Sequence, residues 1–591
     1  MTHRHFKYEG WLYALAFLLA LGLRLTQLGA MPLSDAEAAP ALQALHIAQG
    51  LKPALAPHPF YILSTSILFF LYGGGTNFLA RLIPALIGSL FVFTPLLFDE
   101  KRLRPRPGLL LAFFIALDPG LTALSRQAAS SIFAIVFLTF TFASFHKDKP
   151  SLTGFFAALF LLSGPSIWPG LLGLGITWAI FQAFNSRRNS QPSTDDLLST
   201  TNLQPSTFNL QPSTTNLQPS TFNHQPSTFN LQPSTFLPFL ITLLTAGTLF
   251  FIAPKGLSAA LASIPAFINS WLTSSDVPAT RVFFSLLAYQ PLAFLLASIA
   301  IVRGWVNGGR RIIFLSIWFL VSLLLVVFLP SRQITDLAWA LIPLLVLASI
   351  ELARNFNIFP EERSEVAGVI FLTAFIWVFA WLDFSSMVWF PSDSQEYVIR
   401  FWLLIGSLFL LVLSLILVAA GWSIRTARLG GVWGLVLALG ALGFSGVLGS
   451  AGLRGLTHPE LWWSPSIPMQ AHLLEATVNE ISNLGVGDDT SAPVIIVGLD
   501  SPALEWALRE HQVQVVDTLD ASSSPYFVVT SFESDPVLIA AYRGQDFSWR
   551  LTPMWDTTLP ADWIRWITLR EMPQAGETII LWARDDLFLD K

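Results

Sequence analysis

Long, uninterrupted apolar runs leave this chain few folds to adopt. Runs of about 18 or more residues with few charges are typical of bilayer spans. Only helices or closed barrels can cross lipid, because every backbone polar group there needs an internal partner. The runs are continuous rather than alternating, and only 12% of the residues are charged, so the sequence predicts an all-α polytopic membrane bundle.

Thirteen membrane spans are expected. The first run contains Arg24, is long for a signal peptide and has no small-residue cleavage pattern after it, so we interpret it as a span. The short runs need less apolar neighbours to extend them to the usual length of about 20 residues. The expected spans cover residues 11–29, 78–98, 108–118, 130–146, 152–164, 167–184, 237–253, 281–302, 312–330, 336–350, 366–390, 398–421 and 430–450.

The basic residues of the loops predict the orientation. Loops assigned to the cytoplasmic side hold 17 Lys and Arg, whereas the opposite loops hold four. This asymmetry predicts an integral plasma (inner) membrane protein with a cytoplasmic N-terminus and an extracytoplasmic C-terminal end. Counting the apolar run 60–71 as a span would put Lys101–Arg106 outside. We therefore interpret that run as a helix on the outer surface or dipping into the bilayer.

Four regions follow from these assignments. Residues 1–184 form an N-terminal membrane module with a first outer loop at 30–77, and residues 237–450 form a second membrane module. Between them, residues 185–236 carry a low-complexity QPST repeat with proline in every copy, which forbids a continuous helix. We predict a disordered cytoplasmic loop there.

Residues 451–591 are less apolar and predict a small extracytoplasmic α/β domain. Residues 492–498, 513–516, 526–530 and 578–583 are typical of strands, and Ser501 can cap a helix over 502–510. This domain serves either as a lid or packing unit or as a substrate-binding unit. The chain contains no cysteine, so disulfides and thiolate metal sites are excluded.

Ionisable residues gather near the outer membrane edge, where they are costly unless used or paired. A carboxylate there can take a proton from an attacking hydroxyl. Guanidinium groups can bind phosphate bidentately and stabilise its charge as it leaves. This set suits group transfer from a lipid-linked phosphate. Its members are Asp35, Glu37, His58, Arg24, Arg81, Arg126 and Arg332.

Five of these residues also have a structural interpretation. Asp35 can cap the helix expected over 36–49, and Arg24 can extend to the outer interface. Arg81 and Arg332 can serve packing or topology, and His58 can be an ordinary loop residue. Spacing alone does not decide between these roles.

The order of these elements resembles the GT-C superfamily of polyprenyl-phosphate-sugar-dependent glycosyltransferases, especially its protein O-mannosyltransferase and aminoarabinose-transferase-like branches. The segment LRLTQLGAMPLSDAEAAPALQALHIAQG is similar to their first span and outer loop, and HPFYILSTSILFFLYGGGTNFLARLIPALIGSL to the next stretch. LDPGLTALSRQAAS and PSRQITDLAWALIPLLVLASIELAR resemble two later outer loops. The resemblance covers residues 10–145 well and 325–355 weakly. A flippase-associated group of membrane-glycosyltransferase-like proteins, which also end in a soluble outer domain, is a closer variety.

This resemblance implies a hexosyltransferase-type enzyme that moves a sugar from a polyprenyl-phosphate donor to an extracytoplasmic glycan, lipid or protein acceptor, with inversion. Asp35 would be the general base, and Glu37 the second catalytic residue. The donor-binding candidates would be Arg24, His58, Arg81, Arg126 and Arg332.

The chain departs from the family pattern in its acidic motif. The family carries adjacent acids, whereas this chain reads Asp35-Ala36-Glu37. If Glu37 matches the family glutamate, Ala36 occupies the catalytic position. The alternative is therefore a catalytically degenerate relative that binds lipid-linked sugar or supports a glycan-assembly complex. A transporter is disfavoured because the spans show no internal repeat.

The remaining expectations concern partners and cofactors. Membrane lipid is an expected partner, and nucleic acid is not, because no strongly basic tract is present. No cofactor is predicted. A divalent-metal requirement stays open, because no His/Asp/Glu cluster has convincing ligand spacing.

Overall fold

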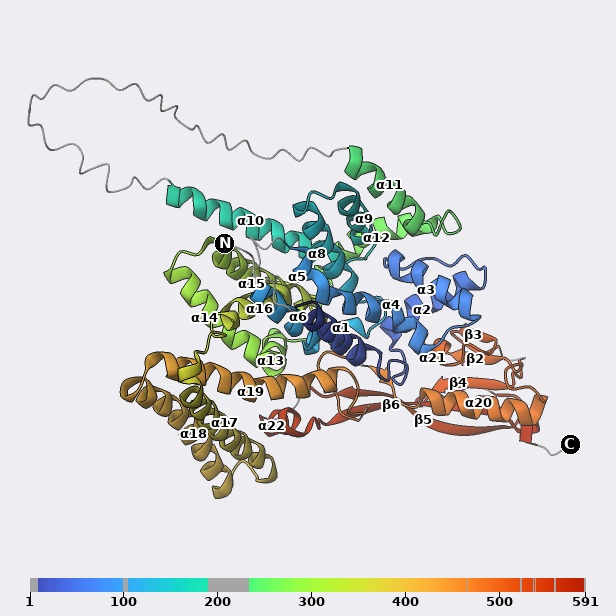
Figure 1. Cartoon of the computed structure of the whole chain (residues 1–591). Helices are drawn as coiled ribbons and strands as arrows, with labels where there is room; N and C mark the ends of the chain where they lie inside the picture. The colour runs from blue at the N-terminus through green and yellow to red at the C-terminus, as the bar shows by residue number, and fades with distance from the viewer. Residues whose placement is uncertain are drawn as a thin grey trace, which may run out of the picture.

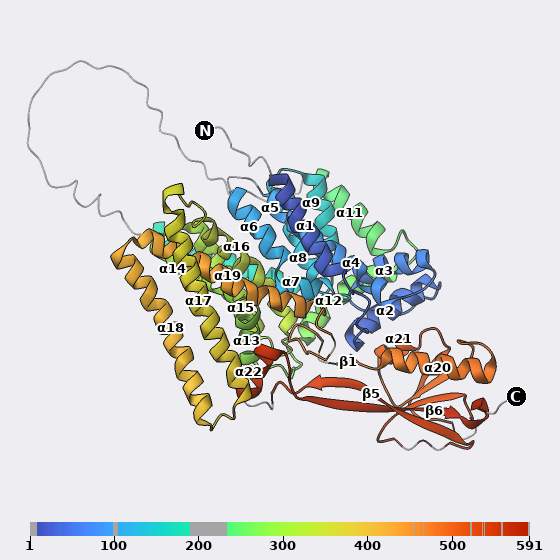
Figure 2. The same ribbon diagram turned by 60° about the horizontal axis from the view of Figure 1, so that its bottom comes forward.

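The computed structural model describes residues 9–98, 105–189 and 233–588, apart from residues 456, 465, 521–522, 535, 537 and 557–559. Helices form a bundle, and a mixed sheet from the end of the chain lies against one end of it (Figure 1; Figure 2). Most of the predicted disordered QPST loop lies outside the described residues.

The helices follow the apolar runs of the sequence. The first module contains α1 (Glu9–Leu25), α2 (Asp35–Ala48), α3 (Pro59–Tyr72), α4 (Asn77–Leu90), η1 (Phe91–Phe93), α5 (Thr94–Leu97), α6 (Pro105–Ala116), α7 (Pro119–Ser125), α8 (Ile132–His146), α9 (Pro150–Leu161) and α10 (Ile167–Asn189). The second contains α11 (Pro233–Gly247), α12 (Lys255–Asn269), α13 (Ala279–Tyr289), α14 (Pro291–Val306), α15 (Arg310–Phe328), η2 (Ile334–Leu337), α16 (Ala338–Ala353), η3 (Pro360–Glu362), α17 (Arg363–Ser386), η4 (Met387–Trp389), α18 (Gln395–Gly421) and α19 (Ile424–Ser450).

Each of the thirteen predicted span ranges contains a helix. Seven helical stretches of the described residues are long and apolar enough to cross a membrane, or nine if each bent helix pair is one span. The other four predicted ranges hold α1, α8, α9 and α11, which have at most 17 residues. The membrane fold is thus confirmed, while the count of thirteen stays a prediction.

Two bent pairs depart from straight spans, and proline explains both. The axes of α6 and α7 differ by 58°, with Pro119 after the break, and those of α13 and α14 differ by 96°, with Pro291 after it. Proline lacks an N–H for the helix ladder and disfavours helical backbone at the residue before it. The predicted span 281–302 is therefore a bent pair of helices in the structure.

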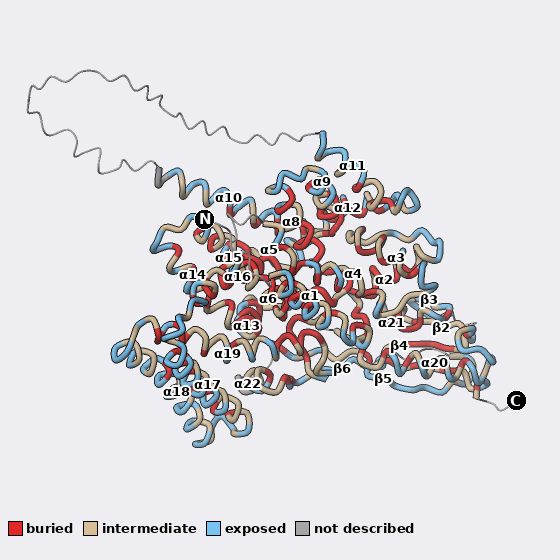
Figure 3. Tube along the Cα trace, in the orientation of Figure 1, coloured by how far each residue is buried: buried red, intermediate tan, exposed pale blue. Residues whose placement is uncertain are grey.

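Burial separates the centre of the bundle from its lipid-facing rim. Helix α16 is buried along most of its length, whereas α18 has one buried residue, Leu411. In Figure 3 the buried trace runs through the middle of the bundle, and α17 and α18 stand at its edge. An apolar helix without protein neighbours on most sides is stable in lipid, as the composition predicts.

The C-terminal region contains a six-stranded sheet with the strand order β1-β5-β6-β4-β2-β3. Strand β2 pairs in parallel with β3 and β4, and the other pairs are antiparallel. The elements are β1 (Ile467–Pro468), α20 (Ala471–Val486), β2 (Val494–Val497), α21 (Pro502–Ala507), β3 (Val513–Val516), β4 (Phe527–Ser531), β5 (Tyr542–Pro553), α22 (Pro560–Leu569), β6 (Gln574–Arg584) and η5 (Asp585–Phe588).

The four predicted strands and the predicted helix all appear in this sheet region. Strand β5 was missed, because its run YRGQDFSWRLTP is mostly polar and lacks an apolar core signal. Helices α20 and α22 were missed as well. The prediction of a small α/β domain is nevertheless confirmed.

Aromatic contacts fix this C-terminal domain on residues 30–77. The Trp506 ring lies 5.9 Å from that of Phe69, and its Nε1 donates to Asn77 Oδ1 at 2.7 Å. A side chain at Gly75 would meet Trp506 at 2.8 Å, so the close approach requires glycine. Arg509 Nε donates to the Gly75 carbonyl at 2.8 Å. The domain therefore covers the bundle end formed by α2 to α4.

Candidate functional site

A cavity of about 590 Å³ lies between the bundle end and the C-terminal domain. Its walls combine serine and threonine hydroxyls, glutamines, two tryptophans and a few charged groups. They include Ser34, Ala36, Glu37 and His58 from residues 30–77, Gln127–Ser131, Arg281 and Gln333–Asp336 from later segments, and Glu460, Trp463, Leu551, Pro553, Trp555 and Gln574 from the C-terminal region. The site thus joins segments far apart in the sequence.

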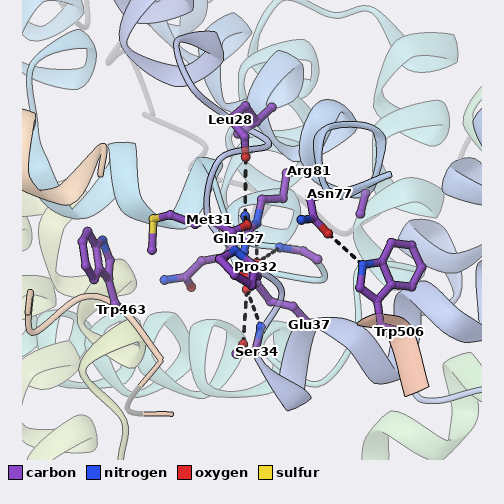
Figure 4. A network of polar contacts seen from close by, with 12 residues as sticks. Leu28, Met31, Pro32, Ser34, Glu37, Asn77, Arg81, Gln127, Trp463 and Trp506 are labelled. Atoms are coloured by element: carbon purple, nitrogen blue, oxygen red, sulfur yellow. Dashed lines mark hydrogen bonds and ion pairs between the residues drawn. The ribbon is translucent and has the colours of Figure 1, made fainter. Parts of the chain in front are cut away.

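Glu37 and Arg81 form a buried bidentate ion pair at the edge of this cavity (Figure 4). Arg81 Nε lies 2.8 Å from Glu37 Oε1, and Arg81 Nη2 lies 2.7 Å from Oε2. The other Arg81 donor contacts go to the carbonyls of Leu28, Met31 and Pro32. The guanidinium is therefore fully used by the protein.

Further donors hold the Glu37 carboxylate. Oε1 accepts from Ala128 N at 3.0 Å, and Oε2 accepts from Ser34 N and Oγ at 3.3 and 3.2 Å. Burial opposes ionisation, but the Arg81 guanidinium and these donors outweigh it and lower the pKa of Glu37 below its ordinary value. Glu37 thus links α2, α4 and the loop before α8, and is a weak proton acceptor.

Asp35 points to the C-terminal domain instead of the cavity. Its Oδ1 accepts from Ser501 Oγ at 2.7 Å and from Ala503 N at 3.0 Å, and its Oδ2 lies 2.5 Å from Arg550 Nη2. Ser34 is the residue before α2, so Asp35 is the first helical residue rather than its cap. Ala36, next to it, lines the cavity.

The remaining predicted arginines bind backbone carbonyls. Arg24 is fully buried, with Nε donating to Ser125 Oγ at 3.0 Å and its other donors to carbonyls of α1 and α6. Arg126 donates to four carbonyls at the end of α1. Arg332 donates to Leu329 and Val277. None of these side chains, nor that of Arg81, is among the described residues that line the large cavity.

His58 does line the cavity. Its Nδ1 is buried without a hydrogen-bond partner among the described residues. Burial lowers the pKa of His58 to about 4, so the imidazole is neutral at physiological pH.

The lowered pKa of His58 implies that the stability of the protein depends on pH. An unfolded histidine binds a proton near pH 6.5, whereas folded His58 binds one only near pH 4, so stability falls as pH falls through this window. As pH falls through this window, we expect the thermal unfolding midpoint of the detergent-solubilised protein to fall less steeply in His58→Asn than in the wild type. The exposed His472→Asn variant is the control and should keep the wild-type slope. An unchanged slope in His58→Asn would contradict the prediction.

The sequence analysis missed three charged residues of the cavity wall, Arg281, Asp336 and Glu460. Arg281 begins the predicted span 281–302 and was taken as part of it, although an ionisable residue at a span end is itself a signal. Glu460 accepts from the Tyr289 hydroxyl and lies 3.7 Å from Arg570 Nε. Burial raises the pKa of Glu460, and Arg570 partly offsets this.

Comparisons with known proteins bear on the fold. No family model and no curated protein matches the chain. The crystal structure of ArnT from Cupriavidus metallidurans bound to undecaprenyl phosphate aligns at 13% identity and TM-score 0.51, over 89% of this chain and 93% of that one. The apo structure of the same protein aligns at 12% identity and TM-score 0.50, over 97% and 98%. The Archaeoglobus fulgidus oligosaccharyltransferase, in complex with zinc and sulfate, aligns at 12% identity and TM-score 0.33, over 88% and 68%.

At this identity the likeness to ArnT concerns the fold. It agrees with the apolar helices of the described residues. The chain is a polytopic membrane protein that shares the fold of ArnT.

Proposed function

We propose that this protein is a membrane glycosyltransferase that moves a sugar from a polyprenyl-phosphate donor to an acceptor hydroxyl on the extracytoplasmic side. The observation that carries the proposal is the roughly 590 Å³ cavity at the end of the bundle. Its hydroxyls, amides and indoles suit a sugar, and pockets of this size are typical of ligand sites. ArnT, which shares the fold, was crystallised with undecaprenyl phosphate.

The proposed topology follows the loop charges. The N-terminus would be cytoplasmic, and the C-terminal domain would lie outside the plasma membrane. The cavity then opens on the side where an extracytoplasmic glycan, lipid or protein acceptor is found. A lipid-linked donor would reach it from the bilayer.

The chemistry is a single displacement. The acceptor oxygen forms a bond to the anomeric carbon, the bond from that carbon to the phosphate oxygen breaks, and polyprenyl phosphate leaves with the electron pair. The acceptor proton passes to a carboxylate, for which we propose Asp35. Because Asp35 is bonded to Arg550 and Ser501, this role requires these contacts to open.

A second candidate function is binding of the lipid-linked sugar without transfer. The position of Ala36 favours it, because its methyl group lines the cavity. The carboxylates on either side of it in the sequence, Asp35 and Glu37, form ion pairs with Arg550 and Arg81 instead. Both candidates predict donor binding. Only the first predicts turnover, so the two measurements together separate them.

Filling the cavity tests the site. Ala36→Trp places an indole in the cavity, and we expect donor binding and transfer to fall at least about tenfold, since overpacked sites exclude ligand. The assay would use a radiolabelled polyprenyl-phosphate hexose and the protein in nanodiscs. The control is Ala54→Trp, at an exposed position of the same outer loop. Equal donor binding by both variants and the wild type would remove the cavity from the proposal.

A further inference from the structure

Arg281 differs from the other arginines near the bundle end. Its side chain is only 9% exposed and lines the cavity. Its Nε is buried without a hydrogen-bond partner, and Nη2 is bonded to Asp556 Oδ1. Among the described cavity-lining residues, Arg281 is the one lysine or arginine. A buried guanidinium with an unused donor is costly unless something else binds there.

The partner of Arg281 is easily exchanged. The side chain of Asp556 is 49% exposed, and ion pairs with a solvent-exposed partner contribute little to stability. A guanidinium fork matches phosphate oxygens as well as carboxylate oxygens. A phosphate oxygen can therefore bind Arg281 in the same way as the Asp556 carboxylate does.

Asp556 also ends a segment that crosses the cavity. Arg550, at its other end, pairs with Asp35. Leu551, Pro553 and Trp555 line the cavity between these two ion pairs. Their alternation follows the two-residue period of a strand. Residues 550–556, which we term the strap, are thus pinned at both ends to the membrane module.

We propose that Arg281 is the binding residue for the phosphate group of a polyprenyl-phosphate ligand, and that Asp556 of the strap holds this site until the phosphate displaces it. The ligand class rests on the proposed function. The anion site itself rests on the burial and pairing of Arg281. Displacement at Asp556 would free one end of the strap and widen access to the cavity.

The other charged groups of the cavity do not offer this site. Glu37 is bonded to Arg81, and Glu460 lies beside Arg570 and Tyr289. Asp336 accepts from Gln333 N at 2.8 Å. All three are acids and would repel a phosphate. A phosphate therefore needs the positive charge of Arg281 to bind in this cavity.

Calorimetry with farnesyl phosphate in detergent tests the proposal, with farnesol as the same tail without phosphate. Asp556→Asn should bind farnesyl phosphate about two- to fivefold more tightly, the range set by a half-exposed ion pair. Arg281→Gln should weaken binding roughly tenfold or more, as expected for a charged hydrogen bond. Arg281→Lys, which keeps the charge but not the fork, should lie between. Asp585→Asn, which removes an exposed carboxylate of the same domain, should leave binding unchanged.

The outcomes distinguish this inference from the proposed function. Farnesol should bind all variants equally, and inorganic phosphate should compete at least about tenfold more weakly than farnesyl phosphate, because it lacks the apolar tail. Equal competition by inorganic phosphate would overturn the lipid-linked assignment. If Arg281→Gln and Arg281→Lys both bound farnesyl phosphate as tightly as the wild type, the Arg281 site would be overturned. The proposed function would not be affected by that result. A wild-type protein that binds neither probe would overturn both.

Discussion

Replacing Glu37 by alanine should lower the free energy of unfolding by about 3–5 kcal/mol, the cost of leaving one buried charge without its partner. Arg81 would keep its positive charge under the C-terminal domain, with only backbone carbonyls around it. The same change also frees Ala128 N and Ser34 N, which lose their acceptor. Equilibrium unfolding in detergent with increasing SDS measures the loss.

A double variant separates the ion pair from general loss of packing. Glu37→Gln/Arg81→Met removes both charges, so we expect it to be more stable than either single variant. The control is Glu571→Ala, which breaks the exposed pair with Arg565 and should cost less than about 1 kcal/mol. If the Glu37 and Glu571 variants lost equal stability, the buried Glu37–Arg81 ion pair would contribute no more to stability than an exposed pair.

Asp35→Asn has the largest expected effect on activity. If Asp35 takes the acceptor proton, its loss should slow transfer about 10²–10⁴-fold, the usual contribution of a general base. Asparagine keeps the shape of the side chain and an oxygen that can accept from Ser501 and Ala503. Donor binding should therefore stay within about twofold of wild type. Radiolabelled sugar transfer and donor binding in nanodiscs give the two readouts.

The matched control for Asp35 is Glu577→Gln. Glu577 lies 3.0 Å from Arg550 Nη1, so this change removes the other acid on the same arginine. It should leave transfer nearly unchanged. If Asp35→Asn kept the full wild-type turnover, Asp35 would be excluded as the base. If the wild-type protein bound the donor but showed no turnover, the binding-only function would be favoured.

The membrane fold was predictable because its signal is local. A long apolar run must bury its backbone polar groups in a helix wherever it occurs, and all thirteen predicted ranges contain one. The strands β2, β3, β4 and β6 were likewise visible as short apolar runs. The polar strand β5 was not, because it has no apolar run of its own. The breaks at Pro119 and Pro291 carry a local proline signal, which the span assignments did not use.

The site was only partly predictable. The sequence placed Asp35, Glu37 and His58 in one outer loop, and the arginines near the same face. It did not show that Arg81 pairs with Glu37, that Arg24 and Arg126 bind backbone carbonyls, or that Arg281 faces the cavity. Apart from the Ala20 carbonyl, which lies one turn before Arg24 in the same helix, these partners are more than 40 positions away. Spacing carries no information about them.

The sequence by itself predicted a helix that starts at Ser34-Asp35 and so has residues 35, 36 and 37 in or beside its first turn. Successive residues of a helix point about 100° apart, so only one or two of them can face a given cavity. The tertiary structure decided which, through contacts from Ser501 and Arg550, more than 460 positions away. Those contacts turn Asp35 toward the C-terminal domain and leave Ala36 and Glu37 on the cavity wall, because a side chain's direction is set by what packs against it.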